Sequence, residues 1–268
     1  MKSAKTPSKS PENSLFVIKL ITVFITVFFT ANTAFGDTYY IDPEFGSGDG
    51  SSWDEACWSF EELFALEWGF QSGDVIYVAK GSLSDSEISI TSDLFESGSG
   101  TINIICGVDN PEWVDYNPDW VPSIDYTDIH VPTPGTGGTA DRVFNINALG
   151  YTINISDVTI RGGDISANSG SGAYGGGIYI QAGTVNFEDV TISGSKASYG
   201  RGICVSSTGI CNIENSIIKD NTGTTFGGGI CNSGTISNLI NSTISGNTCT
   251  AFGGGGIYNE DATITLIA

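Results

Sequence analysis

Hydrophobic and polar residues alternate over short segments in the second half of the chain. Ile178 and Ile180 are two positions apart, as are Val185 and Phe187. A repeat of two residues is the period of a β-strand, and no helical period runs through this region. Glycine, asparagine and serine separate the segments, and these residues accept sharp corners. The pattern predicts short strands joined by tight corners.

Two motifs recur along this half of the chain at nearly constant intervals. The first reads YGGGI, YGRGI, FGGGI and FGGGGI, in steps of 25, 27 and 26 residues from Tyr174, Tyr199, Phe226 and Phe252. The second reads DVTI, DVTI, NSII and NSTI, in steps of 32, 26 and 26 residues from Asp157, Asp189, Asn215 and Asn241. A fixed period of this length indicates a solenoid. Because leucines are scarce, the sequence predicts an all-β parallel β-helix with rungs about 4.8 Å apart, rather than a leucine-rich repeat.

Equivalent positions of successive repeats should stack in columns. Two inward columns are expected, one of Ile178, Ile203, Ile230 and Ile257 and the other of Ile160, Ile192, Ile218 and Ile244. Asn221 and Asn247 should form a ladder at one corner, with each amide bonded to the next rung. Cys204 and Cys231 should point outward on adjacent rungs, near enough for a strained disulfide. The connectivity of the six cysteines stays open.

The first residues are typical of an export signal. Four lysines, at positions 2, 5, 9 and 19, accompany an apolar run that ends in Ala34-Phe35-Gly36, with small residues where a signal peptidase requires them. We place the cut before Asp37, so that residues 1–36 are a signal peptide and 37–268 the mature domain. The alternative is an uncleaved anchor over Leu15–Phe29, although a membrane span needs about 20 apolar residues.

The charge of the chain narrows the choice of partners. The whole chain has 10 basic and 30 acidic residues and a net charge of −20. Cleavage would remove four lysines and Glu12, which leaves 6 basic and 29 acidic residues and a net charge of −23. This balance disfavours nucleic acid, anionic lipid and polyanionic glycans, unless a divalent cation bridges them.

The repeats resemble those of a known family. A GGGI segment alternates with a strand that ends in SGN, as in Gly227–Ile230 and Ser245–Asn247. This alternation resembles the polymorphic-outer-membrane-protein branch of the right-handed parallel β-helix proteins, which have the pectate-lyase-like fold. The segment Tyr39–Gly81 is also similar to their entry segment. The resemblance covers about residues 38–268 and implies an N-terminal cap (37–73) followed by regular repeats, most regular over 151–268.

The cap is expected to contain one short helix. Trp58, Leu63, Leu66 and Phe70 form an apolar stripe along Trp58–Trp68 and beyond, with the glutamates mostly off it. In proteins of the family that the chain resembles, such a helix covers the end of the core. Nearby, DPEFGSGDG from Asp42 lacks the frame and the closing Glu of a calcium loop, so it is interpreted as a turn.

Residues 107–141 do not follow the repeat period and are interpreted as an acidic excursion, a long loop that leaves one rung. They contain five of the eight prolines, and one strand is expected within SIDYTDI. Long excursions of this kind are often binding sites, but a solvated acidic loop is the simpler interpretation. The chain stops within a strand at ATITLIA, without a polar cap, so we expect a truncated C-terminus.

Four residues are candidates for catalysis: Arg161, Lys219, Asp157 and Asp164. Pectate-lyase-like enzymes use a basic side chain to remove a proton and carboxylate-bound Ca²⁺ to acidify it, on the outer face of a strand column. Arg161, Ser193, Lys219 and Ser245 share such a column, so Arg161 and Lys219 should lie two rungs, or about 10 Å, apart. The simpler interpretation is that both cations relieve charge on an acidic surface.

The sequence gives less support to histidine-based catalysis, a zinc site or a pair of adjacent catalytic carboxylates. His130 is the only histidine, which weighs against a histidine-based triad or a zinc site. Glu188 and Asp189 are adjacent, so they should point to opposite faces and cannot flank one glycosidic bond. Carboxylates from different rungs remain open. No cofactor is expected except Ca²⁺, whose ligands are unknown.

The first functional interpretation is a secreted or cell-surface β-helix with an adhesin-like binding or structural role and no chemistry of its own. Its partners would be glycans or cell-surface components, with tyrosines such as Tyr179 and Tyr258 offering flat contacts. It would meet a membrane only through the signal peptide or a missing C-terminal anchor. The alternative is a polysaccharide lyase or glycoside hydrolase of the same fold.

Overall fold

The computed structural model describes residues 36–66, 69–84, 87–96, 98–108, 127–130, 142–166, 174–251 and 253–267. Contacts group Asp37–Ala268 into one compact unit, which begins at the residue expected to follow signal-peptide cleavage. The signal peptide itself lies outside the described residues and stays a prediction. Within the described part of the chain, no helix is long and apolar enough to cross a membrane.

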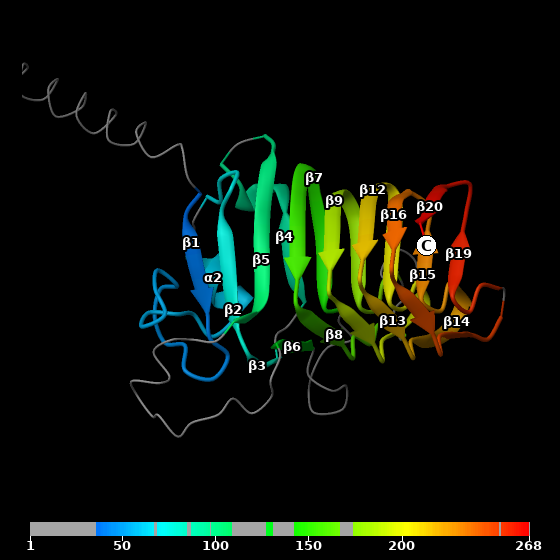
Figure 1. Ribbon diagram of the computed structural model, residues 1–268, viewed down its shortest axis with the longest axis horizontal. Coiled ribbons are helices and arrows are strands. Elements are labelled where there is room, and N and C mark those ends of the chain that lie inside the picture. Colours follow the sequence, from blue (N-terminus) through cyan, green and yellow to red (C-terminus); the bar gives the residue numbers. More distant parts are fainter. Residues whose placement is uncertain are drawn as a thin grey trace, which may run out of the picture. The chain divides into compact units, whose positions relative to one another are not determined.

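Short parallel strands stack into a β-solenoid of about five turns (Figure 1). The 11-stranded sheet contains β1 (Thr38–Ile41), β2 (Val75–Ala79), β4 (Ile88–Thr91), β5 (Gly100–Val108), β7 (Phe144–Ser156), β9 (Ile178–Glu188), β12 (Ile203–Glu214), β15 (Ile230–Asn232), β16 (Thr235–Ile240), β19 (Ile257–Asn259) and β20 (Thr263–Ile267). The 6-stranded sheet contains β3 (Gly81–Ser84), β6 (Thr127–His130), β8 (Val158–Arg161), β10 (Thr191–Ser193), β13 (Ile217–Lys219) and β17 (Thr243–Ser245). The 3-stranded sheet contains β11 (Lys196–Tyr199), β14 (Thr222–Phe226) and β18 (Thr248–Cys249). The predicted all-β parallel β-helix is confirmed, and its handedness stays a prediction.

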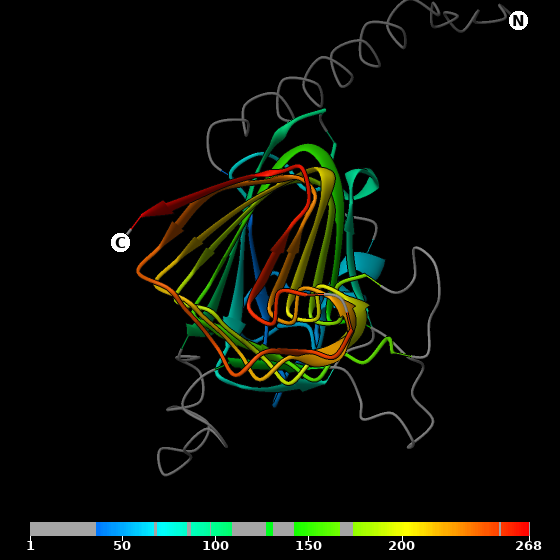
Figure 2. The same ribbon diagram turned by 90° about the vertical axis from the view of Figure 1, so that its right-hand side faces the viewer.

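The repeating turns have four sides, which are seen end-on in Figure 2. The long strands β7, β9 and β12 bend midway and contribute to two sides, where the strand register shifts. The first side contains β4, the first parts of these long strands, β15 and β19. The second side contains β1, β2, β5, the second parts of the long strands, β16 and β20. The 6-stranded and 3-stranded sheets form the third and fourth sides.

The second repeated motif begins at the corner between the second and third sides. Its first residue has a positive φ in every repeat: 59° at Asp157, 53° at Asp189, 50° at Asn215 and 46° at Asn241. Aspartate and asparagine tolerate this left-handed conformation better than most residues that carry a β-carbon. The backbone of the corner therefore accounts for the Asp or Asn that starts each motif.

The first repeated motif forms the turn between the fourth and first sides. Gly227 has a φ of 61°, and a β-carbon there would lie only 2.3 Å from the carbonyl oxygen of Ile230. Only glycine combines this conformation with such a close approach. The glycine run of the motif is thus a requirement of the turn.

Both predicted isoleucine columns are confirmed by the strand register. Ile178, Ile203 and Ile230 are register partners in turn and are fully buried, and Ile257 continues the column. The other column pairs Ile160, Ile192, Ile218 and Ile244 in the same order. These side chains belong to or pack on one hydrophobic core that extends along the solenoid, so the alignment of the repeats is correct.

The predicted asparagine ladder at a corner is also confirmed. The Nδ2 of Asn221 donates to the Oδ1 of Asn247 on the next rung at 2.9 Å, and Asn221 is fully buried. The Oδ1 of Asn221 in turn accepts a hydrogen bond from the backbone N–H of Ser195. The ladder thereby satisfies buried backbone groups at the corner after the third side.

The cap helix is shorter than the sequence predicts. Helix α2 spans Phe60–Ala65 and buries Phe60 and Leu63 against the core. Ser59 caps the helix by accepting the N–H of Glu62, and the Glu62 carboxylate accepts the N–H of Trp58 at 2.7 Å. Trp58 therefore precedes the helix and is 54% exposed, so its place on the buried stripe was wrong. The two bonds resemble a capping box, except that Glu62 accepts the N–H of the residue before the N-cap, and they fix where the helix begins.

Two other segments of the N-terminal half can be compared with expectation. Asp42 is buried, and its Oδ1 accepts the backbone N–H groups of Glu44 and Phe45, so DPEFGSGDG does begin with a turn. Most of the acidic excursion, residues 109–126 and 131–141, lies outside the described residues. Its described parts are Gly107 and Val108, which end β5, and β6, a strand of the third side that pairs with both β3 and β8, so these parts belong to rungs.

Candidate functional site

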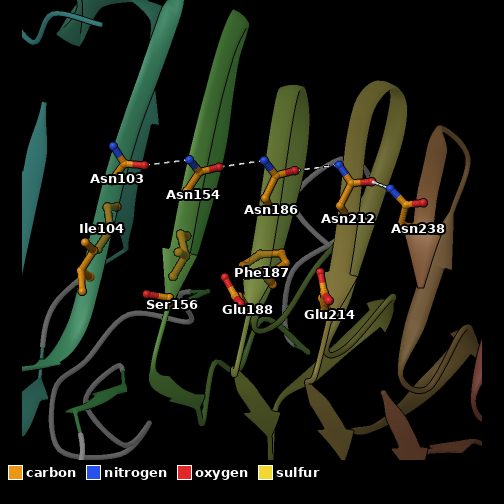
Figure 3. Close-up of a pocket in the computed structure, with 12 residues that line it drawn as sticks. Asn103, Ile104, Asn154, Ser156, Asn186, Phe187, Glu188, Asn212, Glu214 and Asn238 are labelled. Carbon is orange, nitrogen blue, oxygen red and sulfur yellow. Dashed lines mark hydrogen bonds between the residues drawn. The ribbon is translucent and has the colours of Figure 1, made fainter. Parts of the chain in front are cut away.

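A cavity of about 530 Å³ lies on the second side of the solenoid (Figure 3). Strands β5, β7, β9, β12 and β16 each contribute to its lining, so it crosses successive rungs. We call it the asparagine groove, and it is lined by Asn103, Ile104, Ile105, Asn154, Ile155, Ser156, Asn186, Phe187, Glu188, Asn212, Glu214 and Asn238. Its extent along the solenoid suits an extended ligand better than a compact one.

A ladder of asparagines follows this groove from rung to rung (Figure 3). Each side-chain Nδ2 donates to the Oδ1 of the preceding asparagine, at 2.7 Å from Asn154 to Asn103, 2.7 Å from Asn186 to Asn154, 2.7 Å from Asn212 to Asn186 and 3.2 Å from Asn238 to Asn212. The strand register stacks these residues directly above one another. The amides are therefore held in one orientation.

The ladder arises from the alternation of the second-side strands. Ile153 and Ile155 point into the core and are buried, so Asn154 between them points outward and is half-buried. A primary amide has two N–H donors and an oxygen with two lone pairs. Each bond of the ladder uses one donor and one lone pair, which leaves hydrogen-bonding capacity on each amide for a ligand.

Two carboxylates stand side by side at the end of the groove nearest the corner. Glu188 and Glu214 are register partners on adjacent rungs, and both side chains are exposed. In the same column the preceding rung has Ser156. Glu188 lines the groove, but the adjacent Asp189 does not. Asp189 lies at the left-handed corner that follows the strand.

The predicted column of Arg161, Ser193, Lys219 and Ser245 is confirmed by the register of β8, β10, β13 and β17. It lies on the third side, whereas the asparagine groove lies on the second. Arg161 is bound by a carboxylate that the sequence did not single out: its Nε donates to both oxygens of Asp128, at 2.8 and 3.0 Å. The column therefore exists, but it does not line the groove.

The two aspartates of the candidate set do not converge on this column. Asp157 is exposed at the left-handed corner before β8. Asp164 pairs with Lys196 at 3.1 Å and accepts hydrogen bonds from Ser166. Burial opposes ionisation of Asp164, but the Ser166 hydrogen bonds and Lys196 outweigh it and lower its pKa. The four candidates thus occupy separate local environments.

Asp128 also approaches the single histidine. The Nδ1 of His130 lies 3.6 Å from an oxygen of Asp128, and Asp128 is 3% exposed. His130 and Arg161 are register partners, so the three side chains form one cluster on the third side. The described residues contain no group of three or more His, Cys, Asp or Glu side chains arranged to hold a metal ion.

The tyrosines that were expected to offer flat contacts are already stacked. Tyr179 stacks on Tyr174 with ring centroids 5.8 Å apart, and Tyr258 stacks on Phe226 at 4.5 Å. Tyr199 lies between Tyr174 and Phe226 in the same row, at 4.7 and 5.8 Å. Tyr179 and Tyr258 thus each have one ring face against an aromatic neighbour, and the expectation that they offer flat contacts to a partner stays a prediction.

Sequence reasoning missed the asparagine groove, although the sequence contains its signal. The five asparagines follow one another at intervals of 51, 32, 26 and 26 residues, and the last two intervals equal the repeat period. Each lies between two hydrophobic residues or beside one, in INI, VNF, CNI and SNL. Asparagine at an outward strand position in every repeat could have predicted the ladder.

Comparison with protein-family models finds no match for this chain, and comparisons with curated proteins and with solved structures find none either. The geometry of the site is therefore the basis for its function.

Proposed function

We propose that this protein binds an extended, uncharged glycan along the asparagine groove, as a binding protein without chemistry of its own. The observation that carries the proposal is the ladder of amides, which repeats on successive rungs inside a cavity of about 530 Å³. A sugar polymer lying along the solenoid axis would meet an equivalent amide at each rung. Amides that are already oriented lose little conformational freedom on binding, which favours affinity.

Charge supports an uncharged ligand. The chain has a net charge of −20, and Glu188 and Glu214 add two carboxylates to the groove itself. A polyanion would be repelled by both. Sugar hydroxyls, in contrast, can donate to carboxylates and exchange hydrogen bonds with amides.

The cellular setting is also part of the proposal. The predicted signal peptide supports export, and the GGGI and SGN repeats support kinship with the right-handed, pectate-lyase-like β-helices of the polymorphic-outer-membrane-protein branch. Together they favour a secreted, extracellular or outer-surface protein whose partners are glycans or cell-surface components. Ca²⁺ stays a candidate cofactor without assigned ligands.

Calorimetric titration with neutral hexasaccharides (cellohexaose, xylohexaose, mannohexaose and chitohexaose) tests this function. We expect at least one to bind, and the double variant Asn186→Ala/Asn212→Ala to weaken binding about tenfold or more, because two hydrogen bonds contribute about 1 kcal/mol each. The matched control is Thr159→Ala/Thr191→Ala on the third side, which should bind like the parent. The proposal fails if no neutral glycan binds, or if the groove variant and the control bind equally while both remain folded.

Glu188 and Glu214 favour one second candidate, a glycoside hydrolase. They bring two carboxylates from different rungs into one groove, an arrangement that the sequence left open. Retaining enzymes hold such a pair about 5 Å apart. Release of reducing ends from a bound glycan, lost in both Glu188→Gln and Glu214→Gln while binding persists, would establish the hydrolase and replace the proposal of binding alone.

A further inference from the structure

An arginine is buried where other repeats have glycine. Arg201 is the third residue of its YGRGI motif, and the equivalent residues are Gly176, Gly228 and Gly255. Its side chain is fully buried, with an exposure of 0%. A guanidinium stays protonated in proteins, so this repeat has a positive charge in the interior.

Only part of this guanidinium is satisfied by the described residues. Its Nε donates to the carbonyl oxygen of Ala197 at 3.1 Å, and its Nη1 donates to that of Phe226 at 3.3 Å. Its Nη2 is buried without a hydrogen-bond partner among the described residues, and no described carboxylate forms an ion pair with it. A buried cation without a counter-charge is strongly destabilising.

The fourth side leaves space for the guanidinium beside one cysteine. A β-carbon on Gly223 would lie 1.9 Å from the Nε of Arg201, so the guanidinium lies directly over this glycine. Gly223 and Cys249 are register partners on adjacent rungs. The Cys249 Sγ donates a hydrogen bond to the carbonyl oxygen of Thr225 at 3.0 Å, and this carbonyl precedes the Phe226 carbonyl that Arg201 contacts.

The ionisable groups that influence the pKa of Arg201 are cysteines. Burial lowers the pKa of Arg201, and the neighbouring Cys249 and Cys231 oppose that change. Cys231 is 3% exposed and shares a hydrogen bond with Cys204, whereas Cys249 is half-buried. Cys249 therefore combines access from solvent with a buried guanidinium.

We propose that Cys249 gives up the thiol proton that it donates to the Thr225 carbonyl and becomes a thiolate paired with Arg201, and that it is a modification site at which the protein exchanges with an external disulfide. The Cys249 sulfur attacks one sulfur of that disulfide, a new S–S bond forms, and the old S–S bond breaks. The departing sulfur takes the electron pair of the broken bond and a proton from water. The reaction is readily reversed, because Arg201 also stabilises the Cys249 thiolate as a leaving group.

The test is the pH dependence of alkylation by iodoacetamide, mapped to each of the six cysteines by peptide mass spectrometry. An ordinary thiol reacts faster as the pH rises through about 8.5, whereas a thiolate beside a fixed cation reacts at a nearly constant rate well below that pH. We expect Cys249 to be modified first at about pH 6.5, at a rate at least about tenfold above the other cysteines. Oxidised glutathione should form a mixed disulfide at the same residue.

Two variants connect this reactivity to the arginine. Arg201→Gln keeps much of the side-chain volume but removes the charge, and it should slow alkylation of Cys249 at about pH 6.5 by about tenfold or more. Lys219→Gln removes an exposed positive charge from the third side and should leave the rate unchanged. If Arg201→Gln does not fold, the profile of the parent protein decides: a Cys249 rate that rises through about pH 8.5 overturns the proposal. An unchanged rate in a folded Arg201→Gln overturns it as well.

Discussion

Arg161 binds Asp128 of the adjacent rung through three hydrogen bonds. Its Nε donates to both carboxylate oxygens, and its Nη2 donates to one of them. The two partners differ in exposure, because the side chain of Asp128 is 4% exposed and that of Arg161 is 47% exposed. Water can therefore solvate the arginine if the pair is broken, but not the carboxylate. Removal of Arg161 and removal of the Asp128 charge should therefore change the free energy of unfolding by different amounts.

Arg161→Ala should destabilise the protein more than Asp128→Asn does. Removal of Arg161 leaves a buried carboxylate without its cation, for which a cost of about 3 kcal/mol is typical. Asp128→Asn removes the buried charge itself and leaves only the half-exposed guanidinium. Urea unfolding of both variants measures the difference, and a larger loss of stability in Asp128→Asn would contradict this account.

The core column gives a sharper test of register. Ile218 is fully buried between its register partners Ile192 and Ile244, while its neighbour Ile217 is 40% exposed. Ile218→Asp should cost several kcal/mol, because it buries a carboxylate in an apolar stack. The matched control Ile217→Asp should change the free energy of unfolding by only about 0.5 kcal/mol. Equal melting temperatures for the two variants would show that the assigned register is wrong.

Cys204 and Cys231 provide a test of distance on the first side. They are register partners on adjacent rungs, so the prediction that they lie close together is confirmed. Both are thiols in the structure and only 3% exposed. In a Cys249→Ser background, diamide should link Cys204 with Cys231 in preference to every other pair, and the link should form faster in low urea because the thiols are covered. A dominant link between any other pair, identified by non-reducing peptide mapping, would contradict the proximity.

Much of the fold could be predicted because two independent signals agree. The two-residue alternation assigns Ile178 and Ile180 to the inside, and the period of the motifs places Ile203 and Ile230 above Ile178. Both signals come from the backbone, since strand pleat and rung spacing are the same for any side chain. Similarly, the Asp or Asn at each motif start corresponds to a left-handed corner.

The burial of Cys204 could not be predicted in the same way. It points away from the core cluster, as expected, yet it is covered, because the turn at Gly200 brings the chain back against the first side. A β-carbon on Gly200 would lie 2.8 Å from the β-carbons of both Cys204 and Cys231. Alternation distinguishes inside from outside, but it does not show which outer positions a later turn will cover.

The candidate site was harder still to predict. Asp128 reaches Arg161 from β6, and the sequence before β6 lacks the repeated motifs that would give its register. The asparagine groove depends on where β7, β9 and β12 bend, because the bend separates the outward residues of the first side from those of the second. Gly150 and Gly183 lie at the bends of β7 and β9 with positive φ angles of 89° and 94°, but neither glycine belongs to the two repeated motifs, so the motifs do not locate the bends.

The final prediction concerns lyase chemistry at the Arg161 column. We expect no unsaturated product from polygalacturonate with millimolar Ca²⁺, followed by ultraviolet absorbance. Arg161 is bound to Asp128, and Asp164 is paired with Lys196, so the arrangement does not combine an available base with carboxylates aimed at one cation. A net charge of −20 also repels a polyanionic substrate. Steady product formation that disappears in Lys219→Ala, or in Arg161→Ala under conditions where that variant is folded, would show that this column is a base site, because neither substitution alters the asparagine groove on the second side.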